Sequence, residues 1–225
     1  MSYKALLLMP YNKERLDDLH DIKQIMERSS RFISLSGWSG IAAGTCALAG
    51  AYFGHIALKE DYYYSVSTSN QNDYNYFPFF LKQLLHSAIF HIALITFIAA
   101  FISAFIFTYI RSRKNNTPVW STTSRRLLMN VSIPMIVGCF FLLKLLENGN
   151  YGLIAPGCLI FYGLALVNGS KYTLGEIKIL GYCEILLGIV TCQFTDLGLY
   201  FWALGFGVFH IIYGIAMLLK YDRNA

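Results

Sequence analysis

Six long apolar blocks constrain the fold of this chain more than any other feature of its sequence. A helix of about 20 apolar residues is long enough to span the hydrocarbon core of a bilayer. Hydrophobic residues make up 56% of the chain and charged residues only 14%. The pattern predicts an all-α fold, an integral membrane bundle of six transmembrane helices within residues 32–225. The blocks are about Phe32–Leu58, Ser87–Ile110, Leu127–Leu146, Gly152–Asn168, Ile177–Thr195 and Gly198–Leu219.

Residues 1–31 precede the first block and form a separate, charged segment. Apolar residues recur there at three- to four-residue spacing between Leu16 and Met26, which predicts an amphipathic helix over residues 11–31. We expect this helix to lie on the cytoplasmic membrane surface or under the bundle, and docking of a soluble partner is the alternative. The early apolar stretch Ala5–Met9 is too short for a cleavable signal peptide, so the first span is expected to act as the insertion signal.

The lysine and arginine residues predict the orientation of the bundle. Fifteen of the 18 lie before the first block, between blocks two and three, between or at the start of blocks four and five, or after block six. Basic residues flank membrane spans on the cytoplasmic side, so both termini are predicted to be cytoplasmic and residues 59–86 external. Basic residues facing anionic lipid account for the net charge of +5, and no nucleic-acid partner is predicted.

Glu184 places a carboxylate inside the fifth block. Thr173 and Glu176 fit a capping box that starts this helix, and Glu184 then lies about 10 Å past Ile177 along the helix axis. Inserting a carboxylate at that depth costs about 2–3 kcal/mol or more, so we expect the side chain to face protein or water rather than lipid. A purely structural hydrogen-bonding role is the alternative to a functional one.

His210 lies in the sixth block at a depth that matches Glu184. It is about 13 Å from the cytoplasmic end of that block, and the short connection at Asp196 makes the fifth and sixth helices antiparallel neighbours. An imidazole and a carboxylate at one level favour a proton relay or a site for a polar ligand. Three further polar residues in the same half of the chain are candidates for this site, namely Asn168, Lys171 and Tyr213.

His55, His86 and His91 form a weaker set near the outer ends of the first two spans. Three histidines at one membrane level could bind a metal or haem. His86 and His91 are five residues apart, however, which splays them on a helix. We therefore interpret all three as polar boundary residues, and no metal or other cofactor is predicted. The five cysteines form no CxxC pair and are interpreted as small buried apolar residues.

The first span carries small residues at three- or four-residue spacing. Such a stripe lets helix backbones approach closely. We expect it to pack inside the bundle, and a homo-oligomer formed through this face is the alternative. The residues of the stripe are Ser36, Gly40, Gly44, Ala47, Ala51 and Gly54.

Four stretches stand out when the chain is taken as a whole: Glu27–Gly37, Ser124–Leu128, Gly152–Leu186 and Phe201–Tyr213. Together they resemble a family of small polytopic bacterial inner-membrane proteins with no assigned function, and the resemblance covers most of the chain. It implies a multi-pass protein of the bacterial cytoplasmic (inner) membrane and a multi-helix bundle. It transfers no active site.

The sequence favours a non-enzymatic membrane module, embedded in the lipid bilayer, that binds a small or lipidic ligand or a partner protein through spans four to six. Proton-coupled transport of a small solute by Glu184 and His210 is the first alternative, and the short chain without a visible repeat counts against it. A membrane-embedded enzyme or haem protein is the second alternative. Against it, the polar residues are few and scattered, and no P-loop, GxSxG, HExxH or EF-hand motif is present.

Overall fold

The computed structural model describes residues 37–67, 84–114 and 120–222, which form helices and turns without a β-strand. The all-α prediction is confirmed over these residues, and the helix predicted over residues 11–31 lies outside them. The longer helices are α2 (Gly37–Ser67), α4 (Ala88–Lys114), α5 (Thr122–Glu147), α6 (Ile154–Gly169) and α7 (Glu176–Thr191). A last helical run follows, made of α8 (Gly198–Trp202), the π-helix η4 (Ala203–Phe209), α9 (His210–Met217) and the π-helix η5 (Leu218–Asp222).

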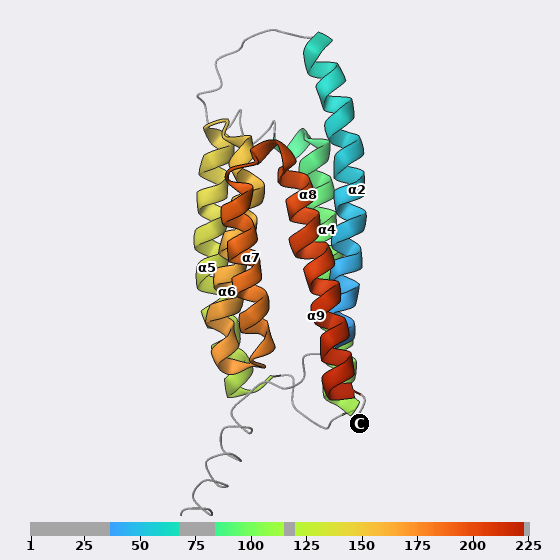
Figure 1. Cartoon of the computed structure of the whole chain (residues 1–225), viewed down its shortest axis with the longest axis vertical. Coiled ribbons are helices and arrows are strands. Elements are labelled where there is room, and N and C mark those ends of the chain that lie inside the picture. The colour runs from blue at the N-terminus through green and yellow to red at the C-terminus, as the bar shows by residue number, and fades with distance from the viewer. Residues whose placement is uncertain (1–36, 68–83, 115–119, 223–225) are drawn as a thin grey trace, which may run out of the picture.

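Successive helices run in alternating directions along the bundle (Figure 1). Five segments of the described chain are long and apolar enough to cross a membrane: Gly37–Lys59, Ala88–Lys114, Thr122–Glu147, Tyr151–Tyr172 and Thr195–Tyr221. The remaining predicted span, over residues 177–195, corresponds to α7, which has 16 residues. A helix of that length extends about 24 Å, less than the ~30 Å thickness of the hydrocarbon core. Five of the six predicted spans therefore have the length and composition of a membrane helix.

Helix α2 packs against the last helical run through glycines in antiparallel register. A Cβ atom at Gly44 would lie 2.6 Å from the carbonyl oxygen of Gly207, and one at Gly214 would lie 2.6 Å from that of Gly37. Only residues without a Cβ atom allow backbones to approach this closely. The predicted packing of the small stripe inside the bundle is confirmed at Gly44 and at Gly40, where a Cβ atom would lie 3.1 Å from the carbonyl oxygen of His210.

Helices α6 and α7 approach each other in the same way. A Cβ atom at Gly163 would lie 2.7 Å from the carbonyl oxygen of Gly181, and one at Gly181 would lie 2.8 Å from that of Gly163. Helix α5 packs on α6, and α4 packs on α2. The described chain thus forms two helical units, one of α2, α4 and the last helical run, the other of α5, α6 and α7 (Figure 1). Contacts between the units run through α8, η4 and α9.

The first span was expected to end at Leu58, but α2 continues as a helix to Ser67. The apolar residues end near Lys59. The Lys and Glu that follow are good helix formers, so the helix continues past the end of the apolar block. Part of the polar segment predicted to connect the first two spans is therefore helical.

The start of α7 differs from the predicted N-cap at Thr173. The helix begins at Glu176, and Gly175 stands at its N-cap without a side-chain hydrogen bond. The carboxylate of Glu176 instead accepts hydrogen bonds from the Lys220 ammonium and, at 3.0 Å, from the Tyr221 hydroxyl.

Candidate functional site

Glu184 lies on the buried face of α7 and is fully enclosed, with 0% of its surface exposed. The opposite face carries exposed apolar side chains such as Ile179 and Leu186. The prediction that this carboxylate faces protein rather than lipid is confirmed. The buried residues recur at the spacing of one helical face and are Ile177, Leu180, Gly181, Glu184, Gly188 and Thr191.

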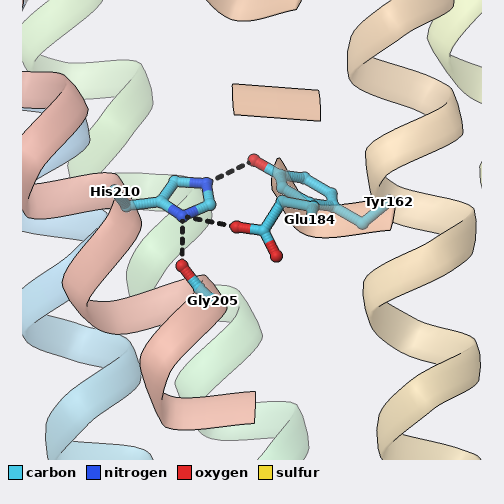
Figure 2. Close-up of polar contacts among 4 residues, drawn as sticks. All are labelled: Tyr162, Glu184, Gly205 and His210. Atoms are coloured by element: carbon cyan, nitrogen blue, oxygen red, sulfur yellow. Dashed lines mark hydrogen bonds and ion pairs between the residues drawn. The ribbon is translucent and has the colours of Figure 1, made fainter. Parts of the chain in front are cut away.

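His210 lies opposite Glu184, at the point where η4 is followed by α9. Its Nδ1 atom is 3.6 Å from Oε1 of Glu184 (Figure 2). The prediction that these two residues meet is confirmed, while their use as a proton or ligand site stays a prediction. A separation of 3.6 Å is longer than a normal hydrogen bond. The contact is therefore an ion pair only when the imidazole is protonated and the carboxyl group is ionised.

The π-helix positions the imidazole. Nδ1 of His210 also lies 3.1 Å from the carbonyl oxygen of Gly205, five residues earlier. π-helical turns are frequent at functional sites. A Cβ atom at Gly205 would lie less than 3.0 Å from Oε2 of Glu184 and from Leu159. Glycine at this position lets the carboxyl group of α7 approach the backbone of η4.

Tyr162 of α6 completes the cluster, because its hydroxyl oxygen is 2.7 Å from Nε2 of His210 (Figure 2). A carbonyl oxygen can only accept a hydrogen bond, so Nδ1 carries the proton that is donated to Gly205. In the neutral ring Nε2 is then an acceptor, and the Tyr162 hydroxyl donates to it. When His210 takes up a second proton at Nε2, that N–H donates to the Tyr162 oxygen, so the contact persists in both charge states.

The carboxyl group of Glu184 has no hydrogen-bond partner among the described residues, at either oxygen. An unpaired carboxylate in a low-dielectric interior is costly. A single proton removes this cost in one of two ways: it neutralises Glu184 directly, or it makes His210 a cation that pairs with the carboxylate. The chemistry available to this arrangement is therefore the binding of one proton between a carboxyl group and an imidazole.

Apolar and aromatic side chains surround the cluster. Leu159 is fully buried, and its side chain lies with that of Leu187 and the Glu184 carboxyl group around Gly205. The ring of Phe206 lies 4.9 Å from the rings of both Tyr162 and Trp202, measured between centroids. Polar contacts enclosed in this way are stronger than the same contacts in water.

Asn168 and Lys171, two of the predicted site residues, lie in a separate contact. The Asn168 side chain donates a hydrogen bond to the carbonyl oxygen of Asn130 at 2.8 Å, and Lys171 donates to Asn168 at 3.2 Å. These bonds hold the end of α6 against α5. Tyr213 is closer to the cluster, on α9 three residues after His210, and its buried hydroxyl has no hydrogen-bond partner among the described residues.

His55, His86 and His91 do not come together as a ligand set. The ring of His55 packs against Tyr200 with centroids 5.8 Å apart, and Nδ1 of His91 lies 2.8 Å from the Ser87 carbonyl oxygen. Within the described part of the chain, no three His, Cys, Asp or Glu side chains form a group that could hold a metal ion.

Tyr162 and Gly205 belong to the cluster but were not among the predicted site residues. Tyr162 is a tyrosine at the centre of an apolar block, and its hydroxyl needs a partner when it is buried. This need for a partner could have identified Tyr162 as a site residue from the sequence. The role of Gly205 depends on the π-helical geometry of η4, for which we find no signal in the sequence.

Comparisons of the chain with known protein families, with curated proteins and with solved structures give no match. The geometry of the cluster is therefore the main guide to its function.

Proposed function

We propose that this chain is a multi-pass protein of the bacterial inner membrane and that the contact between α6, α7 and α9 is a non-enzymatic binding module with a proton as its ligand. One observation carries the proposal. The fully buried carboxyl group of Glu184 has no hydrogen-bond partner among the described residues, and it lies 3.6 Å from His210.

A proton fits this site better than a larger ligand. Gly205, Leu159 and Leu187 close around the carboxyl group, so any larger molecule has to separate α7 from η4 before it can bind. The titratable groups of the cluster around Glu184 are Tyr162 from α6 and His210 from α9.

Two titratable side chains on the other elements packed against α7 are engaged elsewhere. Tyr200 of α8 lies against His55, and Lys171 of the η2 turn (Ser170–Tyr172) donates to Asn168. The described part of η4 carries no ionisable side chain. The charge state of the site is thus set mainly by the Glu184–His210 pair.

The proposed topology has six spans with both termini in the cytoplasm. The end of α4 carries Arg111, Arg113 and Lys114 in its last turn, and it lies at the same end of the bundle as the start of α5 and the C-terminus (Figure 1). This end has the basic residues expected of a cytoplasmic side. Helix α7 runs beside α6, which supports its assignment as the fifth of the six spans.

Infrared difference spectroscopy between acid and alkaline pH tests the proposal on detergent-purified protein. A protonated carboxyl group has a carbonyl stretch that a carboxylate lacks. We expect such a pH-dependent band in the wild-type chain and in Glu147→Gln, a control that removes a carboxylate in a surface ion pair with Lys144. The chain has 13 Asp and Glu residues, and all of them contribute at low pH, so the component assigned to Glu184 is the one that is present in both of these proteins and absent in Glu184→Gln. Identical spectra for wild type and Glu184→Gln would overturn the proposal.

Proton-coupled transport of a small solute is the second candidate. The observation that favours it is the position of the Glu184–His210 pair between the two helical units, because relative movement of such units can expose a site to either side of a membrane. Proteoliposomes that contain a pH-sensitive dye distinguish the candidates. Proton uptake that depends on an added solute and is lost in Glu184→Gln supports a transporter, whereas a titrating band without solute-dependent uptake supports the binding module.

A further inference from the structure

The segments that carry Glu184 and His210 share a sequence pattern. Residues 181–188 read GYCEILLG and residues 207–214 read GVFHIIYG, so the two polar residues occupy the same position between two glycines. In both segments the glycines pack against a neighbouring antiparallel helix, which is α6 for the first segment and α2 for the second (Figure 1). Each polar residue therefore belongs to a closely packed helix pair, either α6 with α7 or α2 with the last helical run.

The contact between the two pairs is less extensive than the contact within each pair. At one end of the bundle, the short connection of residues 192–197 joins α7 covalently to α8. The helices also pack closely there, because a Cβ atom at Gly198 would lie 3.2 Å from the Cβ atom of Ala155 on α6. The two pairs are thus fixed to each other at this end, which is the end away from the C-terminus (Figure 1).

At the end that carries the C-terminus, side chains hold α7 against the last helical run. The carboxylate of Glu176 accepts hydrogen bonds from the Lys220 ammonium and the Tyr221 hydroxyl. The side chain of Lys220 is 61% exposed and that of Glu176 is 24% exposed. An ion pair that water reaches contributes little to stability and is weakened by salt. This contact can therefore break while the glycine contacts within each pair persist.

The Glu184–His210 pair lies deeper between the same two helices. Glu184 is fully buried, and Ile177 and Leu180 separate it from Glu176 on the buried face of α7. Apolar side chains have no group that can accept and donate a proton. A proton therefore reaches Glu184 from this end of the bundle only when α7 and the last helical run move apart.

We propose that Glu176, Lys220 and Tyr221 form a latch whose release opens the Glu184–His210 site to water at the C-terminal end of the bundle. This inference rests on the proposed function, because it concerns how the proton reaches that site. The two helix pairs pivot about the connection of residues 192–197, since a few loop residues can absorb the backbone change of a hinge motion. The latch controls access to the site and takes no part in binding the proton.

A pH jump followed by time-resolved infrared spectroscopy tests the latch in the full-length, detergent-purified protein. The rate at which the component assigned to Glu184 appears is measured in wild type, Glu176→Gln and Glu147→Gln. We expect Glu176→Gln to raise this rate about two- to fivefold, as the loss of an exposed ion pair allows, with an unchanged amplitude at equilibrium. Glu147→Gln is the matched control, because it removes a lysine–glutamate pair within α5, and its rate should equal that of wild type.

Added salt gives a second measurement on the same proteins. Salt screens the exposed Glu176–Lys220 pair. It should therefore raise the rate in wild type and in Glu147→Gln and leave the rate in Glu176→Gln unchanged.

A covalent latch tests the opposite direction. A water-soluble carbodiimide joins a carboxylate and an amine in contact as an amide, and mass spectrometry of the peptides identifies the link between Glu176 and Lys220. Wild-type protein with this link should take up the proton at Glu184 more slowly than untreated protein. Glu176→Gln treated in the same way keeps the Lys144–Glu147 pair and should not be slowed.

The outcomes separate the latch from the site that it covers. A wild-type rate in Glu176→Gln or in the linked protein would overturn the latch and leave the proton-binding site intact. A lower unfolding midpoint of Glu176→Gln with an unchanged rate would also overturn it, because the contact would then be structural alone. The absence of a Glu184 component in the wild-type protein would overturn both proposals.

Discussion

The last helical run makes two contacts of opposite character. On one side, η4 and α9 meet α2 through Gly207 and Gly214, where backbone touches backbone. On the other side, the same segments meet α7 through the Glu184–His210 pair. The glycine contact needs only close approach and is independent of pH. The polar contact is favourable only when its charges are balanced. A change in proton occupancy should therefore alter the packing of α7 and leave the packing of α2 unchanged.

Among the variants that probe these two contacts, Gly44→Leu should reduce the stability of the fold most. A Cβ atom there would lie 2.6 Å from a carbonyl oxygen and 2.7 Å from Ile211, so α2 must move away from α9. Overpacking of this kind typically costs about 1–3 kcal/mol, and we expect a cost at or above the upper end. The midpoint of thermal unfolding in detergent measures it. Gly44→Ala and Gly54→Ala are the matched pair for the control, because a Cβ atom at Gly54 has only an ordinary contact with Leu199 at 3.8 Å. Equal losses in the two variants would contradict the glycine contact.

Gly205→Ala tests the polar contact by steric means. The added methyl group would overlap the carboxyl group of Glu184 and the side chain of Leu159, so α7 must separate from η4. We expect a loss of about 1–3 kcal/mol in unfolding free energy, together with a shift of the Glu184 carboxyl band. Gly175→Ala is the control, because a Cβ atom there meets nothing within 4 Å. If Gly205→Ala left the band unchanged, the carboxyl group would not lie against η4.

The sequence predicted the meeting of Glu184 and His210 through depth alone. Both residues lie about the same distance from one end of antiparallel neighbours, and the cost of exposing a carboxylate to lipid fixes which face of α7 turns inward. The hydrogen bond from His210 to Gly205 could not be predicted, because it depends on a π-helix. The contact between Glu176 and Lys220, 44 residues away, could not be predicted either, because local capping rules do not include such partners.

Tyr162→Phe should have a smaller effect than either glycine substitution. It removes the donor to Nε2 of His210 and leaves the ring packed on Phe206. The loss of one hydrogen bond to a buried group corresponds to about 1 kcal/mol. Nitrogen-15 NMR of labelled histidine should show a changed environment at Nε2 of His210. Tyr200→Phe, at a tyrosine that is 59% exposed, should change neither the midpoint nor the His210 signal.

Glu176→Gln should have the smallest effect, and its size should depend on pH. The folded-state pKa of Glu176 lies below 4.5, because the hydrogen bonds from Lys220 and Tyr221 outweigh the opposing effect of partial burial. A lowered pKa means that the contact stabilises the fold above about pH 4.5 and that this stabilisation is lost as the pH falls further and the carboxylate is protonated. Wild type and Glu176→Gln should therefore differ slightly in unfolding midpoint at neutral pH and converge in acid. The effect is small because Lys220 is exposed to solvent, and added salt should reduce it further.

Glu147→Gln is the control for this prediction. The ion pair that it removes lies within α5 alone, so the contact between the units should be unaffected. A difference between wild type and Glu176→Gln that grows as the pH falls would show that the carboxylate does not make the stabilising contact with Lys220.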